Sequence, residues 1–441
     1  MLQNDSRKVR IGDTFVAIKG IKEDGHKYIK DAIKNGASKI VLEYGDYSNS
    51  LKVKNTKIYL HNYLKRKYRK LINKLKIIGI TGTNGKTTTA YLIYQALNKN
   101  NIKCAYIGTI GFYLNGKIKK NINTTPDILE LYYMLIECIN NDIKYVVMEV
   151  SSQGLAYNRV DGIKFDYAVF TNLTEDHLDY HKTMDNYLKA KQKLFKKLKK
   201  DGVSIINSDD SYYKSFITKN NITYGKNGDY KISNIDYNIN KTIFKLNEEI
   251  YQTSLIGDYN VYNISIVIII LKLLNIKERK IKNTIKKLKG APGRMDMIKY
   301  KSNIIIIDYA HTPDAVLKVL TSINSKGRKI TILGCGGNRD KAKRSIMGNI
   351  ASNNSDYVIY TSDNPRYENE IDIIKDMIQK LDTFNFEIEV NREKAIVKGI
   401  QMLKKDDILL VLGKGHETYQ EIKGVKYPFN DYDMVLKYTR R

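Results

Sequence analysis

The segment that most constrains the fold is 77–97, IIGITGTNGKTTTAYLIYQAL. A short apolar run, a glycine-rich turn and a helical period follow one another, which predicts a buried strand, a loop and a helix. Such a loop lets backbone N–H groups and one lysine surround phosphate oxygens, while a threonine hydroxyl can ligate Mg²⁺. The string departs from a strict GxxxxGK[ST] match, and an accidental glycine-rich turn is the alternative. We predict a nucleotide loop made of Gly82, Thr83, Asn84, Gly85, Lys86, Thr87 and Thr88.

Apolar runs alternate with polar loops and helical periods from Lys76 onward, which is typical of α/β folds with parallel sheets. A second series of this kind predicts strands at 304–307, 330–333, 358–360 and 408–412. With about 150 residues per domain as a guide, 441 residues favour three domains. We expect a small N-terminal α/β domain over 1–74, ending in the basic helix or linker YLKRKYRKLINK. A central phosphate-loop domain over 75–293 and a Rossmann-like α/β domain over 294–441 should follow.

Each of the four later strands runs into a polar segment: DYAHTPDA, GCGGNRDKAKR, TSDNPR and GKGHE. Ligands of open parallel sheets bind beyond the carboxyl ends of the strands. One such segment alone could be an ordinary connection. Four of them at one edge predict a binding site.

The charge balance is 75 Lys and Arg against 47 Asp and Glu, a net +28. This excess fits a nucleic-acid-binding ATPase or an enzyme with anionic substrates, but the lysines are spread along the chain and no RNA- or DNA-binding motif accompanies them. We therefore favour solvated lysines and expect no nucleic-acid partner. Three cysteines without a CxxC pair indicate a reducing, cytoplasmic location. The longest apolar stretch, 264–271, is far shorter than the ~20 residues of a membrane span.

One lysine falls on the apolar face of a predicted helix. In NYLKAKQKLFKKLK the apolar stripe is Tyr187, Leu194, Phe195 and Leu198, and Lys191 lies within it. A buried ammonium loses hydration, so its pKa should fall toward the neutral amine, which can react with carbon dioxide to give a carbamate ligand for Mg²⁺. From the pattern alone, a lysine whose head group reaches water is the simpler interpretation.

Two further side chains are candidates for the metal. Glu149 ends the predicted strand YVVMEV, and His177 follows the strand AVFTN in the loop LTEDHLDYH. Both should lie at strand carboxyl ends, at the edge that also carries the phosphate loop. A structural role and a ligand role remain equally open for each.

The whole chain resembles the Mur ligase family. The strings that carry the resemblance are DSRKVRIGDTFVAIKG, TGTNGKTTT, NTTPD, EVSSQGLAYNRV, FTNLTEDHLDYH, YLKAKQKLF, GDYNVYN, GRMD, DYAHTPDA, GCGGNRDKAKR, DNPR and GKGHETYQ. The resemblance implies a three-domain ATP-dependent carbon–nitrogen ligase of peptidoglycan synthesis, expected as a monomer. It implies that meso-diaminopimelate is added to UDP-N-acetylmuramoyl-L-alanyl-D-glutamate through an acyl phosphate. Lysine or another amino acid, or a specialised paralogue with another acceptor, is the alternative.

The same resemblance implies roles for single residues. ATP and two Mg²⁺ ions are the expected cofactors, with Lys86, His177 and a carbamoylated Lys191 as catalytic residues and with Thr87, Glu149, His177 and Lys191 as metal ligands. The expected adenosine-side residues are Asn260, Asn263, Arg294 and Asp308. Those expected to contact the acceptor are Ser6, Thr124, Thr125, Ser151, Tyr157 and Arg159.

The amino-acid substrate should be chosen in the C-terminal domain. The residues that match the diaminopimelate pattern are Arg339, Asp363, Asn364, Pro365, Arg366, Gly413 and Glu417. Diaminopimelate carries a carboxylate and an ammonium at its distal end, and a guanidinium binds a carboxylate through two parallel hydrogen bonds. Leaving that arginine unpaired, as lysine would, costs on the order of 2 to 4 kcal/mol. Internal salt bridges of Arg339, Arg366 and Glu417 are the alternative interpretation.

Two departures from the family pattern affect these expectations. The string DSR begins at Asp5, earlier than in other members, which predicts a shortened uridine-binding domain. Gln153 and Tyr157 stand where the family often has His and Gln. Both departures concern the side of the site that is expected to bind the acceptor.

Overall fold

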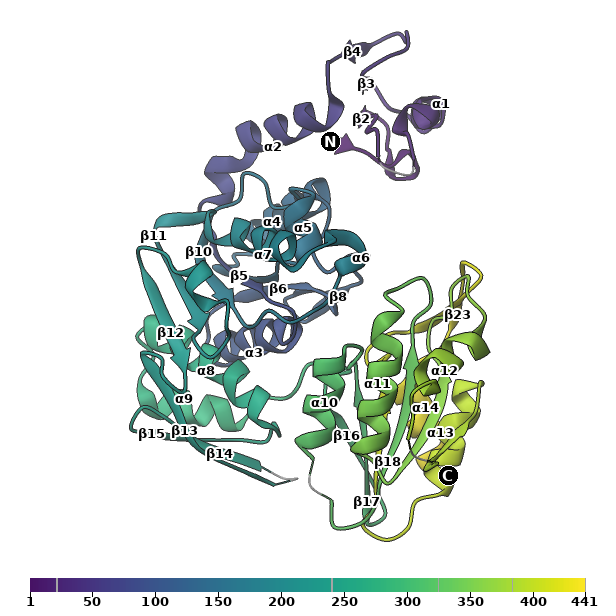
Figure 1. The fold of residues 1–441 in the computed structure, drawn as a ribbon. Helices are drawn as coiled ribbons and strands as arrows, with labels where there is room; N and C mark the ends of the chain where they lie inside the picture. Colours follow the sequence, from purple (N-terminus) through teal and green to yellow (C-terminus); the bar gives the residue numbers. More distant parts are fainter. Residues whose placement is uncertain (21–22, 239–240, 324, 383, 441) are drawn as a thin grey trace.

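Four sheets organise the chain in the computed structural model, which describes residues 1–20, 23–238, 241–323, 325–382 and 384–440 (Figure 1). A four-stranded parallel sheet is followed by an eleven-stranded mixed sheet, a six-stranded mostly parallel sheet and a two-stranded hairpin. The expected α/β architecture with parallel sheets is therefore confirmed.

The N-terminal sheet consists of β1 (Leu2–Gln3), β2 (Thr14–Val16), β3 (Lys39–Leu42) and β4 (Ser50–Lys52), with α1 (Ile29–Lys34) beside it. The basic stretch after this sheet is a helix, α2 (Thr56–Ile72), which leads down to the central sheet (Figure 1). Asn55 caps it by accepting a hydrogen bond from the Ile58 N–H at 2.8 Å. Leu60 and Leu64 are buried where α2 packs on the central part of the chain.

The strands of the central sheet are β5 (Lys76–Thr81), β6 (Cys104–Gly108), β7 (Gly111–Leu114), β8 (Lys117–Lys119), β9 (Tyr145–Glu149), β10 (Phe165–Phe170), β11 (Leu198–Asn207), β12 (Asn221–Gly225), β13 (Tyr230–Asn238), β14 (Lys241–Leu246) and β15 (Glu249–Thr253). They lie in the order β15-β14-β13-β12-β11-β10-β5-β9-β6-β7-β8. Strand β5 thus pairs in parallel with β9 and β10, so the segments after these three strands leave the sheet side by side.

Helices cover both faces of this sheet. They are α3 (Lys86–Lys99), α4 (Ile128–Asn140), α5 (Ser152–Ala156), α6 (Leu178–His181), α7 (Met184–Phe195), α8 (Asp258–Leu273) and α9 (Glu278–Lys286). Apolar side chains of α3, α8 and α9 form one core with Ile78 and Ile80 of β5, while those of α4 and α7 form another with Ile77. Successive side chains of β5 therefore point to opposite faces of the sheet and pack in two separate cores.

The C-terminal sheet contains β16 (Asp296–Tyr300), β17 (Asn303–Asp308), β18 (Lys329–Cys335), β19 (Tyr357–Ser362), β20 (Phe386–Ile388) and β21 (Ile408–Leu412), in the order β16-β17-β21-β18-β19-β20. The helices around it are α10 (Pro313–Thr321), α11 (Ala342–Asn353), α12 (Glu370–Ile378), α13 (Arg392–Gln401) and α14 (Asp431–Thr439). Strands β17, β21, β18 and β19 are adjacent and parallel, which confirms that the four polar segments share one edge.

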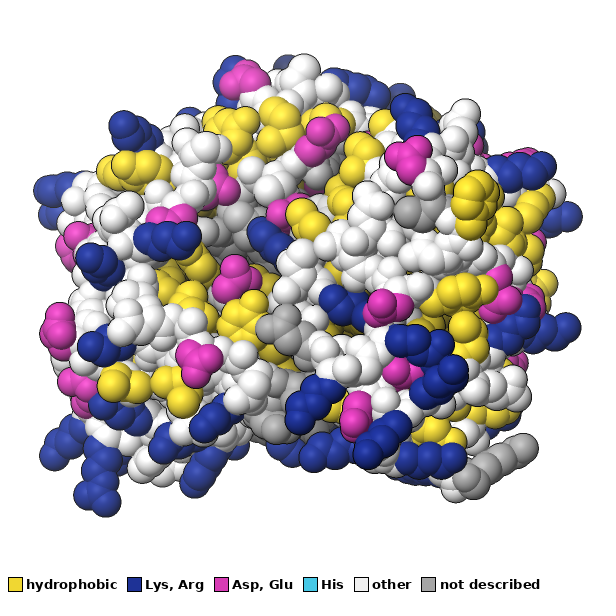
Figure 2. Space-filling view, turned by 60° about the horizontal axis from the view of Figure 1, so that its bottom comes forward, with side chains coloured by type: hydrophobic (Ala, Val, Ile, Leu, Met, Phe, Trp, Pro, Cys, Tyr) yellow, Lys and Arg dark blue, Asp and Glu magenta, His cyan; other side chains and the backbone are white. Residues whose placement is uncertain are grey.

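Charge is distributed widely over the face shown in Figure 2. Lys and Arg side chains are scattered across it with Asp and Glu between them. The net charge of +28 therefore does not single out one binding surface on this face. No helix within the described residues combines the length and the apolar character needed to cross a bilayer.

A buried ion pair supports the edge of the C-terminal sheet. Arg392 and Asp431 are fully buried, and two guanidinium nitrogens each donate to the carboxylate at 2.8 Å. The same guanidinium donates to the Leu412 carbonyl at 3.0 Å, at the end of β21. Arg392 thus connects α13 and α14 to the point where the GKGHE segment begins.

We expect replacement of Arg392 by Ala to destabilise the protein strongly. Removing one partner leaves the Asp431 carboxylate buried without its counter-charge, which costs about 3 to 5 kcal/mol. Urea denaturation followed by circular dichroism measures the loss. The exposed pair of Lys437 and Glu393 supplies the control, because Lys437→Ala should leave the denaturation midpoint almost unchanged. Equal midpoints for the two variants would contradict this assignment.

Candidate active site

The glycine-rich turn lies between β5 and α3, as the sequence predicts. Gly82 has no room for a side chain, because a Cβ there would lie 1.9 Å from the Thr171 hydroxyl. Gly85 precedes the helix with a φ of +84°, in the left-handed region that favours glycine. The loop therefore presents bare backbone at the amino end of α3, the arrangement that binds phosphate.

Lys86 opens α3 and folds back on the loop. Its ammonium donates to the carbonyl oxygens of Gly82 at 2.9 Å and Thr83 at 2.7 Å. Burial lowers its pKa, and the nearby Glu149 carboxylate opposes that shift. Lys86 is thus already held at the place where phosphate charge would enter.

Glu149 is a fully buried carboxylate at the end of β9. One oxygen accepts from the Tyr106 hydroxyl at 2.5 Å and the Thr109 N–H at 2.8 Å. The other accepts from the Thr87 hydroxyl at 2.8 Å. These hydrogen bonds fix the carboxylate beside the threonine that the sequence predicts as a metal ligand.

Lys191 is 1% exposed, so its head group does not reach bulk water. Its nitrogen donates to the Gly82 carbonyl at 2.7 Å and lies 4.2 Å from the centre of the Tyr187 ring. Burial lowers its pKa well below the usual lysine value, and the charge of Lys86 adds to the shift. The place of Lys191 on the buried face is confirmed, whereas the simpler interpretation, a head group that reaches water, is wrong because the ammonium donates to the Gly82 carbonyl instead. The predicted stripe is also wrong at Leu198. Helix α7 ends at Phe195, and Leu198 starts β11 opposite Phe165.

His177 lies at the entrance of the same region, just before α6. Its φ of +56° is left-handed, and its side chain is 42% exposed. Its Nε2 lies 3.4 Å from an Asp176 carboxylate oxygen. Burial and the charges of Lys86 and Lys191 lower its pKa, while Asp176 opposes the shift. The imidazole therefore borders the cavity with its pKa held below the usual histidine value.

These side chains line one cavity of about 560 Å³. Lys86, Glu149, His177 and Lys191 all border it, so the predicted convergence of the four is observed. Thr124, Ser151 and Arg159 contribute to the same wall, and so do the C-terminal residues Arg339, Arg366 and Glu417. The cavity therefore spans the central and the C-terminal sheets.

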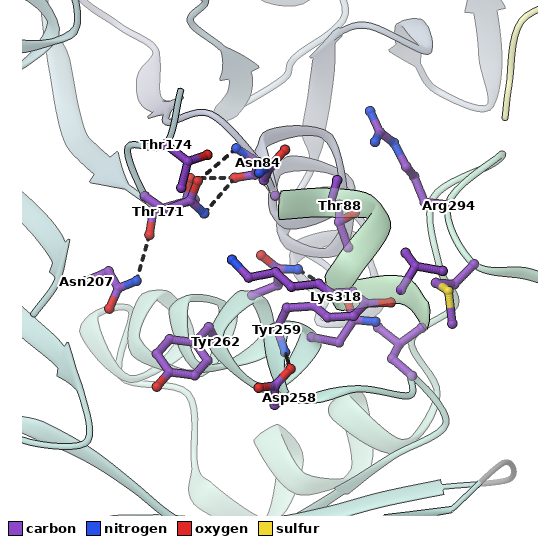
Figure 3. Close-up of a pocket in the computed structure, with 18 of the residues that line it drawn as sticks. Asn84, Thr88, Thr171, Thr174, Asn207, Asp258, Tyr259, Tyr262, Arg294 and Lys318 are labelled. Carbon is purple, nitrogen blue, oxygen red and sulfur yellow. Dashed lines mark hydrogen bonds between the residues drawn. The ribbon is translucent and has the colours of Figure 1, made fainter. Parts of the chain in front are cut away.

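A second cavity, of about 320 Å³, also borders the phosphate loop and shares Asn84, Gly85, Thr88 and Arg294 with the first (Figure 3). Its lining includes all four predicted adenosine-side residues, namely Asn260, Asn263, Arg294 and Asp308. The Tyr259 hydroxyl and the Arg294 Nε are buried there without a hydrogen-bond partner among the described residues. Unsatisfied polar atoms beside a phosphate loop fit a nucleoside that would bind them.

The C-terminal part of the chain contacts the phosphate loop directly. The Asn84 amide donates to the Asp314 carboxylate at 2.8 Å, and Asp314 also accepts from Lys318 of α10 at 3.0 Å. Asp314 belongs to the DYAHTPDA segment. This hydrogen bond brings the two sheets together around the nucleotide cavity.

A third cavity, of about 140 Å³, lies among the polar segments of the C-terminal sheet. Its lining includes Arg339, Asp363, Asn364, Arg366, Gly413 and Glu417. Glu417 accepts from the Asn364 amide at 2.7 Å and pairs with buried Lys414 at 3.0 Å. Arg366 forms a longer ion pair with Glu421, at 3.7 Å. The internal salt bridges considered as alternatives thus exist for Arg366 and Glu417, which still border the cavity.

Some predicted residues lie outside these three cavities. Ser6 is buried in the N-terminal part, where its carbonyl accepts from Asn35. Thr125 lies behind the wall and donates to the Glu149 carbonyl at 3.0 Å. Tyr157 contacts Arg159, with the guanidinium 5.5 Å from its ring centre. The remaining two, which also border none of the three, are Gly82 and Pro365.

Sequence reasoning missed several residues that the cavities contain. They are Asp176, Tyr309, His311, Lys343 and His416. The Lys343 ammonium donates to the His311 carbonyl at 3.1 Å. Four of them belong to the polar segments at the strand ends of the C-terminal sheet, and Asp176 precedes His177 in the loop LTEDHLDYH, so the chemistry of each segment is the signal that could have found them.

The protein side chains at the loop supply only some of the ligands that a magnesium ion needs. Within the described ranges, no three His, Cys, Asp or Glu side chains gather as a ready metal site. The Thr87 hydroxyl and the Glu149 carboxylate are hard oxygen donors 2.8 Å apart at the wall of the large cavity. Mg²⁺ typically takes one or two carboxylates together with phosphate oxygens and water. The donor set therefore fits a magnesium ion that arrives with a nucleotide.

Three family models match the chain: "Mur ligase family, catalytic domain" over residues 1–75, "Mur ligase middle domain" over 80–271 and "Mur ligase, glutamate ligase domain" over 293–415. UDP-N-acetylmuramoyl-L-alanyl-D-glutamate–2,6-diaminopimelate ligase of Clostridium perfringens is 41% identical, with 98% of this chain and 93% of the relative covered. The enzyme of the same name from Fusobacterium nucleatum is 42% identical, with 99% and 93% covered. A solved structure of that ligase is similar with 31% identity and a TM-score of 0.68, covering 100% of this chain and 94% of its own.

We expect Gly85→Ala to weaken nucleotide binding about tenfold. A Cβ at this position would lie 2.6 Å from the Asn263 side chain, and the left-handed backbone costs an L-residue about 1 to 2 kcal/mol. The loop would shift to a different conformation in the free protein. Nucleotide binding would then have to restore the phosphate-binding conformation, which lowers the affinity. Titration calorimetry with a non-hydrolysable ATP analogue measures the affinity. Gly116→Ala is the matched control, because its φ is +78° with nothing within 4 Å. Unchanged affinity in the Gly85 variant would contradict the loop assignment.

Proposed function

Because the chain belongs to the Mur ligase family, we infer that it is an ATP-dependent ligase of peptidoglycan synthesis that adds meso-diaminopimelate to UDP-N-acetylmuramoyl-L-alanyl-D-glutamate. Relatives named for this reaction match almost the full chain. The observation that carries the inference is the large cavity, whose wall combines the phosphate loop with Arg366 and Glu417. A triphosphate, an acid and a diamino acid can meet there.

The reaction joins two substrates at the expense of ATP. The γ-carboxylate oxygen of the D-glutamyl residue attacks the terminal phosphorus of ATP, ADP departs, and an acyl phosphate forms. The diaminopimelate amine then attacks the acyl carbon, loses a proton and expels phosphate as the amide forms. Family membership implies the use of ATP and Mg²⁺.

Lys86 and the loop amides would hold the phosphates in the first step. The ammonium lies among loop carbonyls at the amino end of α3, where negative charge is stabilised by the N–H groups and the helix dipole. Thr87, Glu149 and His177 would hold magnesium, which when bound neutralises phosphate charge. Asn260, Asn263, Arg294 and Asp308 would hold the nucleoside in the second cavity.

Lys191 would act as a carbamate. Lys86 and Lys191 donate to the same Gly82 carbonyl at 2.9 and 2.7 Å, so their nitrogens lie within about 6 Å of each other. Two ammonium charges at that distance repel by roughly 3 kcal/mol at an effective dielectric of 20. A neutral Lys191 amine removes the repulsion. Attack of this amine on carbon dioxide would form an N–C bond and release a proton, and the resulting carbamate would be an anionic ligand beside Lys86 that could hold a second Mg²⁺.

The acceptor would occupy the central side of the cavity and the amino acid the C-terminal side. Thr124, Ser151 and Arg159 border the first part, with Thr125 and Tyr157 behind them and Ser6 toward the nucleotide-sugar. Arg339, Arg366 and Glu417 border the second. Arg366 would bind the distal carboxylate and Glu417 the distal ammonium.

We also propose domain boundaries, location and oligomeric state. The division into 1–74, 75–293 and 294–441 is supported by the separate sheets and by the three matched segments. Three buried cysteine thiols without disulfides suit the reducing cytoplasm. A monomer is sufficient because residues of one chain line all three cavities.

The substrate assignment predicts a preference between two diamino acids. Phosphate release from ATP, with the UDP-muramoyl dipeptide as acceptor, should be about 30- to 1000-fold more efficient with meso-diaminopimelate than with L-lysine, because lysine leaves Arg366 without a carboxylate. Reactions without acceptor are the control and should release no phosphate. Equal kcat/KM for both amino acids would overturn the choice of substrate, and no turnover with either would overturn the acceptor.

The carbamate predicts a specific loss in Lys191→Ala. Removing the anionic ligand should lower kcat about a hundredfold or more, as loss of one group that stabilises transition-state charge does. Carbon-13 NMR in labelled bicarbonate should show a carbamate signal in the wild type and none in the variant. Lys189→Ala, which removes an exposed lysine of the same helix, should keep both the rate and the signal. A wild-type protein without the signal would exclude the carbamate.

A further inference from the structure

A small hairpin folds against the DNPR segment of the C-terminal sheet. Strands β22 (Tyr419–Ile422) and β23 (Val425–Pro428) pair in antiparallel fashion next to that sheet (Figure 1). The two residues between them, Lys423 and Gly424, have φ of +49° and +80°. Two left-handed residues make the tight turn that suits the twist of a hairpin. The hairpin is therefore a defined element and not a loose connection.

The hairpin holds the TSDNPR segment at three residues, Ser362, Asn364 and Arg366. Four hydrogen bonds connect them: Gln420 Nε2 to Ser362 Oγ at 2.7 Å, the Glu421 N–H to Asn364 Oδ1 at 2.8 Å, the Arg366 N–H to the Glu421 carbonyl at 2.9 Å and the Lys423 N–H to the Arg366 carbonyl at 2.5 Å. Both main-chain polar groups of Arg366 are thus bonded to the hairpin. The backbone of this arginine cannot turn without breaking the contact.

Arg366 needs this support because its backbone is left-handed. Its φ is +53°, a conformation that costs an L-residue about 1 to 2 kcal/mol. Such strain persists where the surroundings determine the conformation, and the hairpin bonds on either side of Arg366 provide that. The Arg366 side chain reaches back to Gly336 and Gly337.

The Arg366 guanidinium is restrained by two contacts of its own. One terminal nitrogen donates to the Gly337 carbonyl at 2.7 Å, and a Cβ on Gly336 would lie 3.0 Å from the same atom. Glu421 faces the opposite part of the group, with a carboxylate oxygen 3.7 Å from Nε. A guanidinium has five N–H donors, so one hydrogen bond and one longer ion pair restrict its orientation and leave donors for the cavity.

We propose that Glu421 is a positioning residue for selectivity: it holds the Arg366 guanidinium in the orientation that binds the distal carboxylate of the amino-acid substrate. The proposal rests on the proposed function, in which Arg366 takes that carboxylate. A guanidinium that binds a carboxylate through two hydrogen bonds must have its plane oriented before the substrate arrives. The Arg366 side chain is only 21% exposed, so its surroundings limit the orientations that it can take. Lysine has no distal carboxylate, so its binding does not depend on this orientation.

The test compares both amino acids in the wild type, Glu421→Ala, Glu421→Gln and Lys426→Ala. In Glu421→Ala the KM for meso-diaminopimelate should rise about tenfold, while its kcat and the KM for L-lysine change less than twofold. Glu421→Gln keeps an oxygen toward Nε and should recover part of the loss. Lys426, an exposed residue of the same hairpin, is the control and its variant should match the wild type.

The outcomes separate this proposal from the function on which it rests. An equal rise of KM for both amino acids, or no rise for either, would overturn the role of Glu421 while the wild-type preference for diaminopimelate stands. Thermal unfolding midpoints measured in parallel detect a misfolded variant. If Glu421→Ala is misfolded, the KM values of Glu421→Gln decide the question, because its side chain keeps the shape of glutamate. A wild type without preference would overturn the substrate assignment itself.

Discussion

The Gly82 carbonyl is the point on which the rest of the site depends. Two lysine nitrogens, from Lys86 and Lys191, donate to this one oxygen inside a largely buried region. A single carbonyl dipole cannot neutralise two ammonium groups, so the arrangement requires a neutral amine, additional negative charge, or both. Phosphates, a carbamate and the Glu149 carboxylate would supply that charge. The geometry is therefore prepared for a reaction that gathers anionic groups.

The sheet order brings these groups together. Because β5 lies between β9 and β10, the phosphate loop, Glu149 and the segment that carries His177 leave neighbouring strands at the same edge. The C-terminal sheet presents four polar segments toward the same space, and the Asn84 to Asp314 hydrogen bond links its helix α10 to the phosphate loop. A ligase needs both parts, since one activates the acid and the other delivers the amine.

The amino-acid side of the site has supports of its own. The buried Arg392–Asp431 pair holds the end of β21, and the β22–β23 hairpin holds the strained backbone of Arg366. Neither support contributes to chemistry directly. Both fix the place and direction of segments that border the cavities.

The sequence by itself determined the elements whose signals are local. The phosphate loop, the four strands with polar ends and the DNPR and GKGHE segments follow from patterns within a few residues, and the structure contains each. Only the tertiary structure decided between a lysine that reaches water and a buried one, because the partner of Lys191 lies 109 residues away at Gly82. The same holds for the contact of Glu421 with Arg366 and for the end of α7, where pairing of Leu198 with β10 overrides a continued helical pattern. Periodicity records which face of an element is apolar, whereas burial, charge and strain depend on which distant segment packs against it.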